Sequence, residues 1–194
     1  MTFRATLVLL ILALSAPAFA DGAVLSLMTK EDHARLDNFD ATRARAIAEA
    51  RAGGAPDDVA ILDQVLGGHP LPLRTYGFEG DWRCRTIKLG GAAPKLVVYG
   101  WFKCRFEADD AGLWLDKLTG SQRTRGMFYD DGDTRMIYLG KLFYGYEKPG
   151  LYGEDPARNQ IAYGFRVGPN RARLEFPAPQ YESVMDVIEL VPQA

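Results

Sequence analysis

The chain has 194 residues, of which 47% are apolar and 25% are charged, and this is the composition of an ordinary globular protein. Its formal charge of -2 leaves no excess of positive charge for nucleic-acid phosphates, and its 2 histidines supply almost no imidazole for zinc. We therefore expect no nucleic-acid partner, no metal site and no cofactor.

The first twenty residues have the form of a signal peptide. Arg4 gives a positive start, an apolar run follows from Ala5 to Leu14, and Ala18-Phe19-Ala20 is an A-x-A cleavage site. The alternative is an uncleaved membrane anchor, but a bilayer core needs about 20 apolar residues and this run ends early. We expect residues 1–20 to be removed on export, which leaves a periplasmic or secreted chain without a transmembrane span.

Two helices are expected between the cleavage site and residue 72. Thr29 can cap the first helix, because acidic residues follow it in the first turn, and the alanine-rich pattern ends at Gly53. Pro56 begins a shorter helix with apolar residues at helical spacing, which ends at Gly67. The pattern predicts an antiparallel helical pair within residues 21–72.

Beyond Pro72 the apolar pattern changes to period two, with β-branched and aromatic residues between short turns. Strands are expected at about residues 81–89, 96–106, 113–118, 122–129, 134–143, 160–167, 171–176 and 184–191. They could form a sandwich or a barrel, and closure into a barrel removes exposed edges. We expect an α+β fold in which the N-terminal helical pair precedes an antiparallel, lipocalin-like β-barrel of about eight strands at residues 73–194.

The two cysteines lie on one predicted hairpin. With its turn centred on Pro94, Cys84 faces Cys104 and Trp82 faces Phe106. In an exported chain such a pair is expected to oxidise. The alternative is a redox or metal-binding dithiol, but there is no C-x-x-C and no nearby histidine. We therefore expect a structural disulfide.

The opposite face of this hairpin is basic, with two cations on each strand: Arg83, Arg85, Lys103 and Arg105. These cations repel one another unless something negative lies nearby. An anionic ligand is one interpretation, but acidic turns at residues 109–110 and 130–133 fall at the same end and favour salt bridges within the chain. The turns lack the D-x-D-x-D-G pattern, so calcium is not expected.

The other end of the predicted sheet collects polar and aromatic residues, and barrel mouths are common ligand sites. Arg123 could hold a carboxylate, while tyrosines could stack on a ligand or form hydrogen bonds with it. The candidate ligand-binding residues are Ser121, Gln122, Arg123, Tyr144, Tyr146 and Tyr152. The alternative is that these aromatic loops simply plug the barrel.

No catalytic residue is expected. Ser121 follows a glycine without the G-x-S-x-G pattern, and His33 and His69 lie outside the predicted sheet. Nothing in the sequence pairs carboxylates for glycoside cleavage, because the candidates are spread over strands and loops: Glu147, Glu154, Glu175, Glu182 and Glu189.

Several sequence blocks together resemble a family of exported Gram-negative bacterial proteins that is known as a domain of unknown function. The blocks are residues 80–85 (GDWRCR), 99–105 (YGWFKCR), 119–123 (TGSQR) and 181–183 (YES). The resemblance spans nearly all of the chain beyond residue 20 and implies no activity, substrate or catalytic residue.

A weaker resemblance is to the calycin barrels, which include lipocalins. Gly80 and Trp82 are similar to the G-x-W signature of that group. The resemblance implies that this tryptophan packs at a closed barrel end against a late-strand arginine, for which Arg173 is the nearest candidate. Fold analogy alone does not assign a function.

Three functions remain. A binding module needs only a mouth with a few placed polar groups, so we favour a non-enzymatic protein that binds a small ligand or peptide. A cell-envelope hydrolase needs a base or nucleophile beside a partner, which the sequence does not show. An envelope scaffold would bind another protein through the helical pair and needs an exposed apolar stripe there. The expected partner is a small molecule or an envelope protein.

Overall fold

The computed structural model describes residues 21–73 and 77–193, and the expected signal peptide at 1–20 lies outside them. Four helices come first: α1 (Asp21–Leu27), α2 (Lys30–Asp37), α3 (Phe39–Gly53) and α4 (Pro56–Leu66). In the described residues, no helix combines the length and hydropathy that a membrane span needs.

The start of the helical segment follows local sequence signals. Thr29 caps α2 as expected, because its Oγ1 accepts a hydrogen bond from the backbone N–H of Asp32 at 3.1 Å. The longer expected helix is interrupted at Asn38, whose backbone N–H and side-chain Nδ2 both donate to the carbonyl of Ala34. An asparagine side chain that bonds to a carbonyl of the preceding turn competes with continuation of the helix. The segment therefore forms two helices, α2 and α3.

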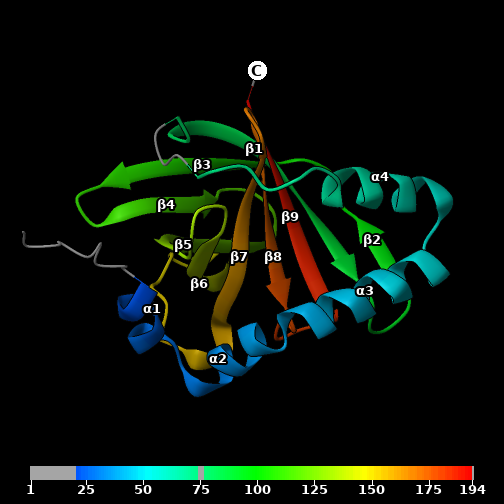
Figure 1. Ribbon diagram of the computed structural model, residues 1–194, viewed down its shortest axis with the longest axis horizontal. Coiled ribbons are helices and arrows are strands. Elements are labelled where there is room, and N and C mark those ends of the chain that lie inside the picture. The colour runs from blue at the N-terminus through cyan, green and yellow to red at the C-terminus, as the bar shows by residue number, and fades with distance from the viewer. Residues whose placement is uncertain (1–20, 74–76, 194) are drawn as a thin grey trace, which may run out of the picture.

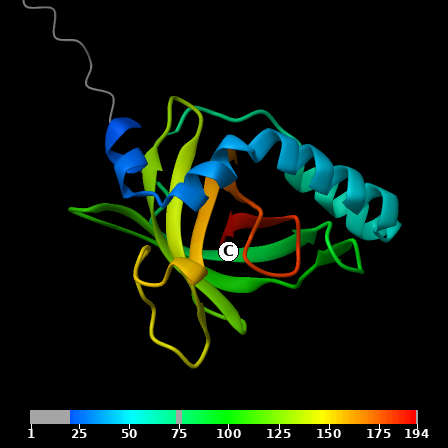
Figure 2. The same ribbon diagram turned by 90° about the horizontal axis from the view of Figure 1, so that it is seen from below.

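After the helices, the chain forms strands that close into an antiparallel barrel, which confirms the expected α+β fold. They are β1 (Gly80–Leu89), β2 (Leu96–Val98), β3 (Phe102–Asp109), β4 (Gly112–Lys117), β5 (Gln122–Asp130), β6 (Met136–Tyr144), β7 (Asn159–Gly168), β8 (Arg171–Pro177) and β9 (Met185–Pro192). Pairing of β1 with β9 closes eight strands into the barrel, and β2 is an additional strand beside the end of β1. Figure 1 shows α2 and α3 crossing one side of it, and Figure 2 shows the same arrangement from below.

The β1 hairpin differs in register from the expected pairing. Trp82 pairs with Cys104, and Cys84 pairs with Phe102, so the cysteines are diagonal neighbours instead of facing each other. The turn begins earlier than expected, because Leu89 already pairs with Leu96, and an irregularity at residues 99–101 divides the arm into β2 and β3. The net shift is two residues, which leaves every side chain on its predicted face.

The disulfide between Cys84 and Cys104 is therefore confirmed in spite of the register. Their Cα atoms are 5.8 Å apart, and both residues point into the barrel and are buried. The distance lies within the range that a disulfide requires.

Two apolar clusters organise the packing. One lies inside the barrel and contains a continuous run of aromatic rings, with centroids 5.2 to 5.9 Å apart: Trp82, Phe106, Phe128, Tyr138 and Phe176. The other joins the helices to the outer face of β6, β7 and β9. In this outer cluster, Leu36, Phe39 and Leu62 of the helices are buried. Alternation along each strand supplies both clusters, since one face points inward and the other outward.

Two of the four cations on the basic face of the first hairpin find counter-charges on adjacent strands, not in the acidic turns. Arg105 Nε lies 2.7 Å from Asp81 Oδ1, and Arg85 Nε lies 2.6 Å from Glu189 Oε2. The ring of Trp101 also lies against the guanidinium groups of Arg83 and Arg85. Salt bridges within the chain are thus confirmed for Arg85 and Arg105, and sheet pairing, not the acidic turns, supplies their partners.

The tryptophan–arginine contact implied by the calycin resemblance is not formed. Trp82 lies inside the barrel, where its Nε1 donates to the carbonyl of Phe78 at 2.7 Å. Arg173 lies on the outer face, where its Nε donates to Glu175 at 2.6 Å and its Nη1 to carbonyls at the end of α4. The two side chains are on opposite faces because 82 is an inward and 173 an outward position.

Candidate functional site

A cavity of about 250 Å³ occupies one end of the barrel. Its wall is formed by inward-facing polar residues near the strand ends: Thr86, Lys88, Lys117, Thr124, Gln160 and Asp186. The loop at residues 178–184, between β8 and β9, contributes Tyr181 and Glu182 to the mouth. The volume is just below the ~300–1,000 Å³ of pockets for drug-sized ligands, so the space suits a smaller molecule.

The cavity exists because the inward positions change character along the strands. On β4 they run from Leu113 through Leu115 to Lys117, and on β1 they run from Trp82 and Cys84 to polar residues. Large rings fill the barrel up to Phe176, which forms part of the cavity wall. The dry interior and the polar cavity therefore meet partway along the same strands.

The predicted turn residues lie at the rim of this cavity. Ser121, Gln122 and Arg123 all line it, as the position of this turn at the barrel mouth suggested. Arg123 Nε donates to the backbone carbonyl of Gly120 at 3.0 Å, which leaves the rest of its guanidinium for other partners. The Gln122 carbonyl accepts a hydrogen bond from Lys117 Nζ at 2.6 Å.

The three predicted tyrosines are not among the residues that line the cavity. Tyr144 and Tyr146 stack on each other with centroids 5.8 Å apart, and Tyr146 is 86% exposed. Tyr152 instead joins the loop to the helices, because its hydroxyl donates to Asp32 Oδ2 at 2.5 Å and accepts from the backbone N–H of Thr29. Burial, together with that carboxylate, raises the pKa of Tyr152 to about 12, so the phenol stays protonated.

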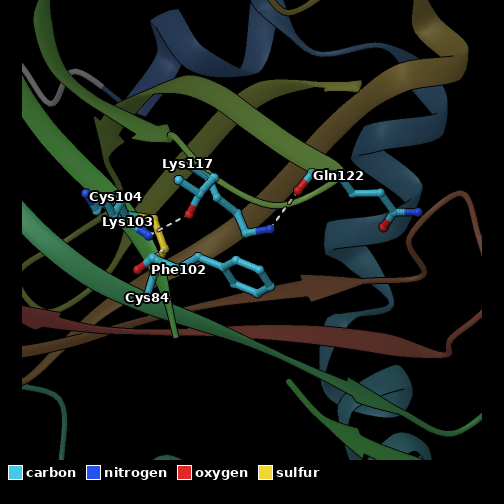
Figure 3. Close-up of a disulfide and its surroundings, with 7 residues drawn as sticks. Cys84, Phe102, Lys103, Cys104, Lys117 and Gln122 are labelled. Carbon is cyan, nitrogen blue, oxygen red and sulfur yellow. Dashed lines mark hydrogen bonds between the residues drawn. A yellow bond between two sulfur atoms is a disulfide. The ribbon is translucent and has the colours of Figure 1, made fainter. Parts of the chain in front are cut away.

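Lys117 is a cavity residue that was not predicted. It is only 6% exposed, and its Nζ lies 4.0 Å from the centre of the Phe102 ring, which faces it in Figure 3. Within the described chain no carboxylate forms an ion pair with it. Burial, reinforced by the positive charges of Arg123 and Lys88, lowers the pKa of Lys117 to about 8.

A carboxylate and a second lysine occupy the neighbouring part of the wall. Burial raises the pKa of Asp186 to about 6, although Lys88 and a 2.5 Å hydrogen bond from Ser183 Oγ favour its ionised form. Lys88 Nζ lies 2.6 Å from Glu182 and 4.0 Å from Asp186. Burial opposes the charge of Lys88, but these two carboxylates still hold its pKa above the ordinary value.

Gln160 adds an unsatisfied group. Its Oε1 is buried and has no hydrogen-bond partner within the described residues. A buried carbonyl oxygen without a partner is costly, by about 1–3 kcal/mol, so it is a natural acceptor for an N–H or O–H of a bound molecule.

The wall residues could be found in the sequence only by extending the strand alternation to its end. Lys117 follows Leu113 and Leu115 at inward spacing, and Lys88 follows Trp82 and Cys84 in the same way. Gln160 and Asp186 carry no such signal of a shared site, because they come from β7 and β9, and it is the closing pairing of β1 with β9 that brings these late strands beside the early ones. In the part of the chain that the structure describes, His, Cys, Asp and Glu form no group suited to a metal ion.

Comparisons with known proteins identify a family but no function. A search of curated proteins gave no match, and a search of solved structures also gave none. A model of one protein family matches residues 26–190, a range that extends from α1 into β9. The chain therefore belongs to the family described as "Domain of unknown function (DUF4893)".

Proposed function

We propose that this chain is an exported, non-enzymatic binding protein that holds a small anionic ligand in the barrel cavity. One observation supports it most directly: Lys117 and Arg123 both line the cavity, and within the described residues neither has a carboxylate partner. Unpaired cations in a partly buried space favour an anion, because transfer of charge out of water is costly unless it is compensated.

The other charged groups around the cavity also favour a negatively charged ligand. Lys88 is already paired with Glu182, and Arg35 and Arg158 are paired with carboxylates of their own. The uncompensated charge is therefore that of Lys117 and Arg123. A guanidinium suits a carboxylate, because its parallel N–H groups can bind both oxygens.

The hydrogen-bond acceptors in the cavity narrow the class of ligand further. Gln160 Oε1 needs a donor, and the Asp186 carboxyl lies in the same cavity. A small carboxylate that also carries a hydroxyl or amino group would satisfy both the cations and these acceptors. The apolar length of a fatty acid would find no matching apolar space, because the interior beyond Phe176 is filled by aromatic rings.

Export is supported by the sequence of residues 1–20 and remains part of the proposal. Detection of the mature chain in the periplasmic or culture fraction, with its N-terminus at Asp21 by mass spectrometry, tests it.

A scaffold that binds through the helices has less support. The apolar residues of α2, α3 and α4 are largely used against the barrel, since Leu36, Phe39 and Leu62 are buried. The exposed stripe that a scaffold requires is therefore not formed by these three side chains.

Ligand binding can be tested with small acids and their uncharged amides, beginning with lactate and lactamide. Thermal shift and calorimetry should show that acids of this class bind and that the matched amides bind at least tenfold more weakly. Arg123→Gln should weaken acid binding by about tenfold or more, because it removes a charge-assisted contact.

Arg105→Gln is the matched control, because this arginine lies on the outer surface near the filled end and pairs with Asp81. Tyr146→Ala separately tests whether the predicted tyrosines take part. If no small carboxylate in the panel binds better than its amide, or if Arg105→Gln weakens binding as much as Arg123→Gln, the proposal is wrong.

A further inference from the structure

Lys117 has the surroundings of a nucleophile as well as those of a binding group. It is the buried amine on the cavity wall, whereas Lys88 is held by two carboxylates. We propose that Lys117 captures a small carbonyl compound covalently and reversibly, as an imine formed inside the cavity. The inference depends on the proposed function only in requiring that ligands enter this cavity.

The geometry leaves the amine available. Lys117 extends from the end of β4 toward the start of β5, where its Nζ donates one hydrogen bond to the Gln122 carbonyl at 2.6 Å (Figure 3). The Phe102 ring covers another side of it at 4.0 Å. No carboxylate in the described chain fixes the proton on this nitrogen. A lysine in a desolvated pocket beside other cations is a known way to activate an amine for attack on carbonyls.

Charged groups from three other strands act on this amine. Arg123 on β5 and Lys88 on β1 disfavour its protonation, and Asp186 on β9 favours it. Burial and the two cations prevail, so the pKa of Lys117 falls to about 8. An exposed lysine has a pKa of about 10.4, so near pH 8 a far larger fraction of Lys117 than of any exposed lysine is neutral.

The chemistry requires no oxidant or reductant. The nitrogen lone pair attacks the carbonyl carbon and forms the C–N bond, while the carbonyl π electrons move to oxygen. A proton passes from nitrogen to that oxygen and gives a carbinolamine. Protonation of its hydroxyl releases water as the nitrogen lone pair forms the C=N bond, and a proton is then lost from nitrogen. Amine and carbonyl thus become imine and water.

Asp186 is a carboxyl group on the cavity wall that can exchange the protons of the dehydration step. Its pKa of about 6 means that it can serve as either acid or base near neutral pH. Because Arg123 lies beside the amine and can hold a carboxylate, the favoured class of ligand is a small oxo acid, in which a carbonyl is adjacent to a carboxylate.

The experiment uses glyoxylate as the probe and cyanoborohydride to reduce any imine to a stable amine. The mature protein is treated at pH 8, and peptide mass spectrometry locates the adducts over time. Lys117 should be modified on the order of tenfold faster than any exposed lysine, with a rate that rises with pH around 8. Lys117→Arg should remove this fast phase.

Lys141→Arg is the matched control, since this lysine pairs with Glu154 outside the cavity and its loss should leave the fast phase unchanged. Peptide mapping of the adducts on the wild-type protein shows whether Lys117 is modified preferentially, even if the Lys117→Arg variant folds poorly. Adducts spread over exposed lysines with none favoured at Lys117 overturn the proposal.

Lactate provides the test that separates this inference from the proposed function, because it has no carbonyl that can form an imine. If lactate-class acids bind but Lys117 forms no adduct, the imine is rejected and the binding function stands. If Lys117 is modified rapidly although no such acid binds, reversible anion binding is rejected and covalent capture stands.

Discussion

The two ends of the barrel are made by the same strands but are filled in different ways. Toward one end, packed aromatic rings and the disulfide occupy the interior, and Trp82 and Cys84 are almost fully buried. Toward the other, the inward positions hold two lysines, an aspartate, two threonines and a glutamine around a cavity of about 250 Å³. The filled end thus supplies the stability that allows the open end to keep polar groups incompletely paired.

The largest effect is expected from removing the tryptophan ring inside the filled end. Trp82→Ala should lower the free energy of unfolding by about 3–5 kcal/mol, because it leaves a cavity among packed aromatic rings. Trp101→Ala is the control, since that ring is 41% exposed on the outside and its loss should cost less than about 1 kcal/mol. Chemical denaturation measures both, and similar losses would contradict the assignment of a packed end.

The disulfide should give the next largest effect. The bond lies at the filled end and closes a loop of 20 residues, and the chain-entropy relation gives a stabilisation on the order of 3 kcal/mol for a loop of this size. A reducing agent should therefore lower the unfolding midpoint of the native sequence. The double variant Cys84→Ala/Cys104→Ala should show no response to the reductant, and a wild-type protein equally indifferent to it would refute the prediction.

Asp186 tests the open end through pH. Its pKa of about 6 in the fold is above the ordinary 3.8, so the folded state binds this proton more tightly than the unfolded state does. The resulting stabilisation is present below about pH 4 and is lost as the pH rises through about 6. Asp186→Asn should abolish this loss, which amounts to on the order of 2 kcal/mol between pH 4 and pH 7. Parallel stability curves for the two proteins over this range would show that the carboxyl is not desolvated.

The smallest effect concerns the boundary between the two ends. Thr124 Oγ1 and Tyr138 Oη are 2.7 Å apart and both residues are buried, although Thr124 also reaches the cavity wall. Tyr138→Phe should cost about 1 kcal/mol, while Thr124→Val should cost more, since it leaves a phenol unpaired in a dry site. A double-mutant cycle measures the coupling between the two hydroxyl groups. If the losses in free energy of unfolding simply add in the double variant, this hydrogen bond does not mark the boundary between the filled end and the cavity.

Local signals in the sequence were sufficient for much of the fold. Period-two alternation and turn residues located the eight barrel strands, and Thr29 marked the start of a helix. The disulfide was predictable because alternation along a strand alone decides which face of the sheet a cysteine occupies, and a shift of two residues does not change that face. The register was not predictable, because the hairpin turns earlier than expected and an irregularity at residues 99–101 adds a residue to one arm without a distinctive local pattern.

The candidate site was predictable at its rim and not in its wall. Residues 119–123 form a turn, and the order of turns along a meander shows at which end it lies. Gln160 and Asp186 join the same cavity only because β1 pairs with β9 and brings late strands beside early ones. Tyr152 was expected at the mouth, but its contact with Asp32 depends on how the helices dock, which is tertiary information.

The buried ion pairs between helix and barrel limit how this chain can be divided. Glu175 is fully buried on the outer face of β8 and is shared by Arg43 of α3 and Arg173, both 2.6 Å away. A fragment that began at residue 73 would lose Arg43 and uncover Ile137, Leu139 and Ile161, which the helices now shield. Such a fragment would be prone to aggregate. Any minimal version of this domain must therefore retain the helices along with the strands.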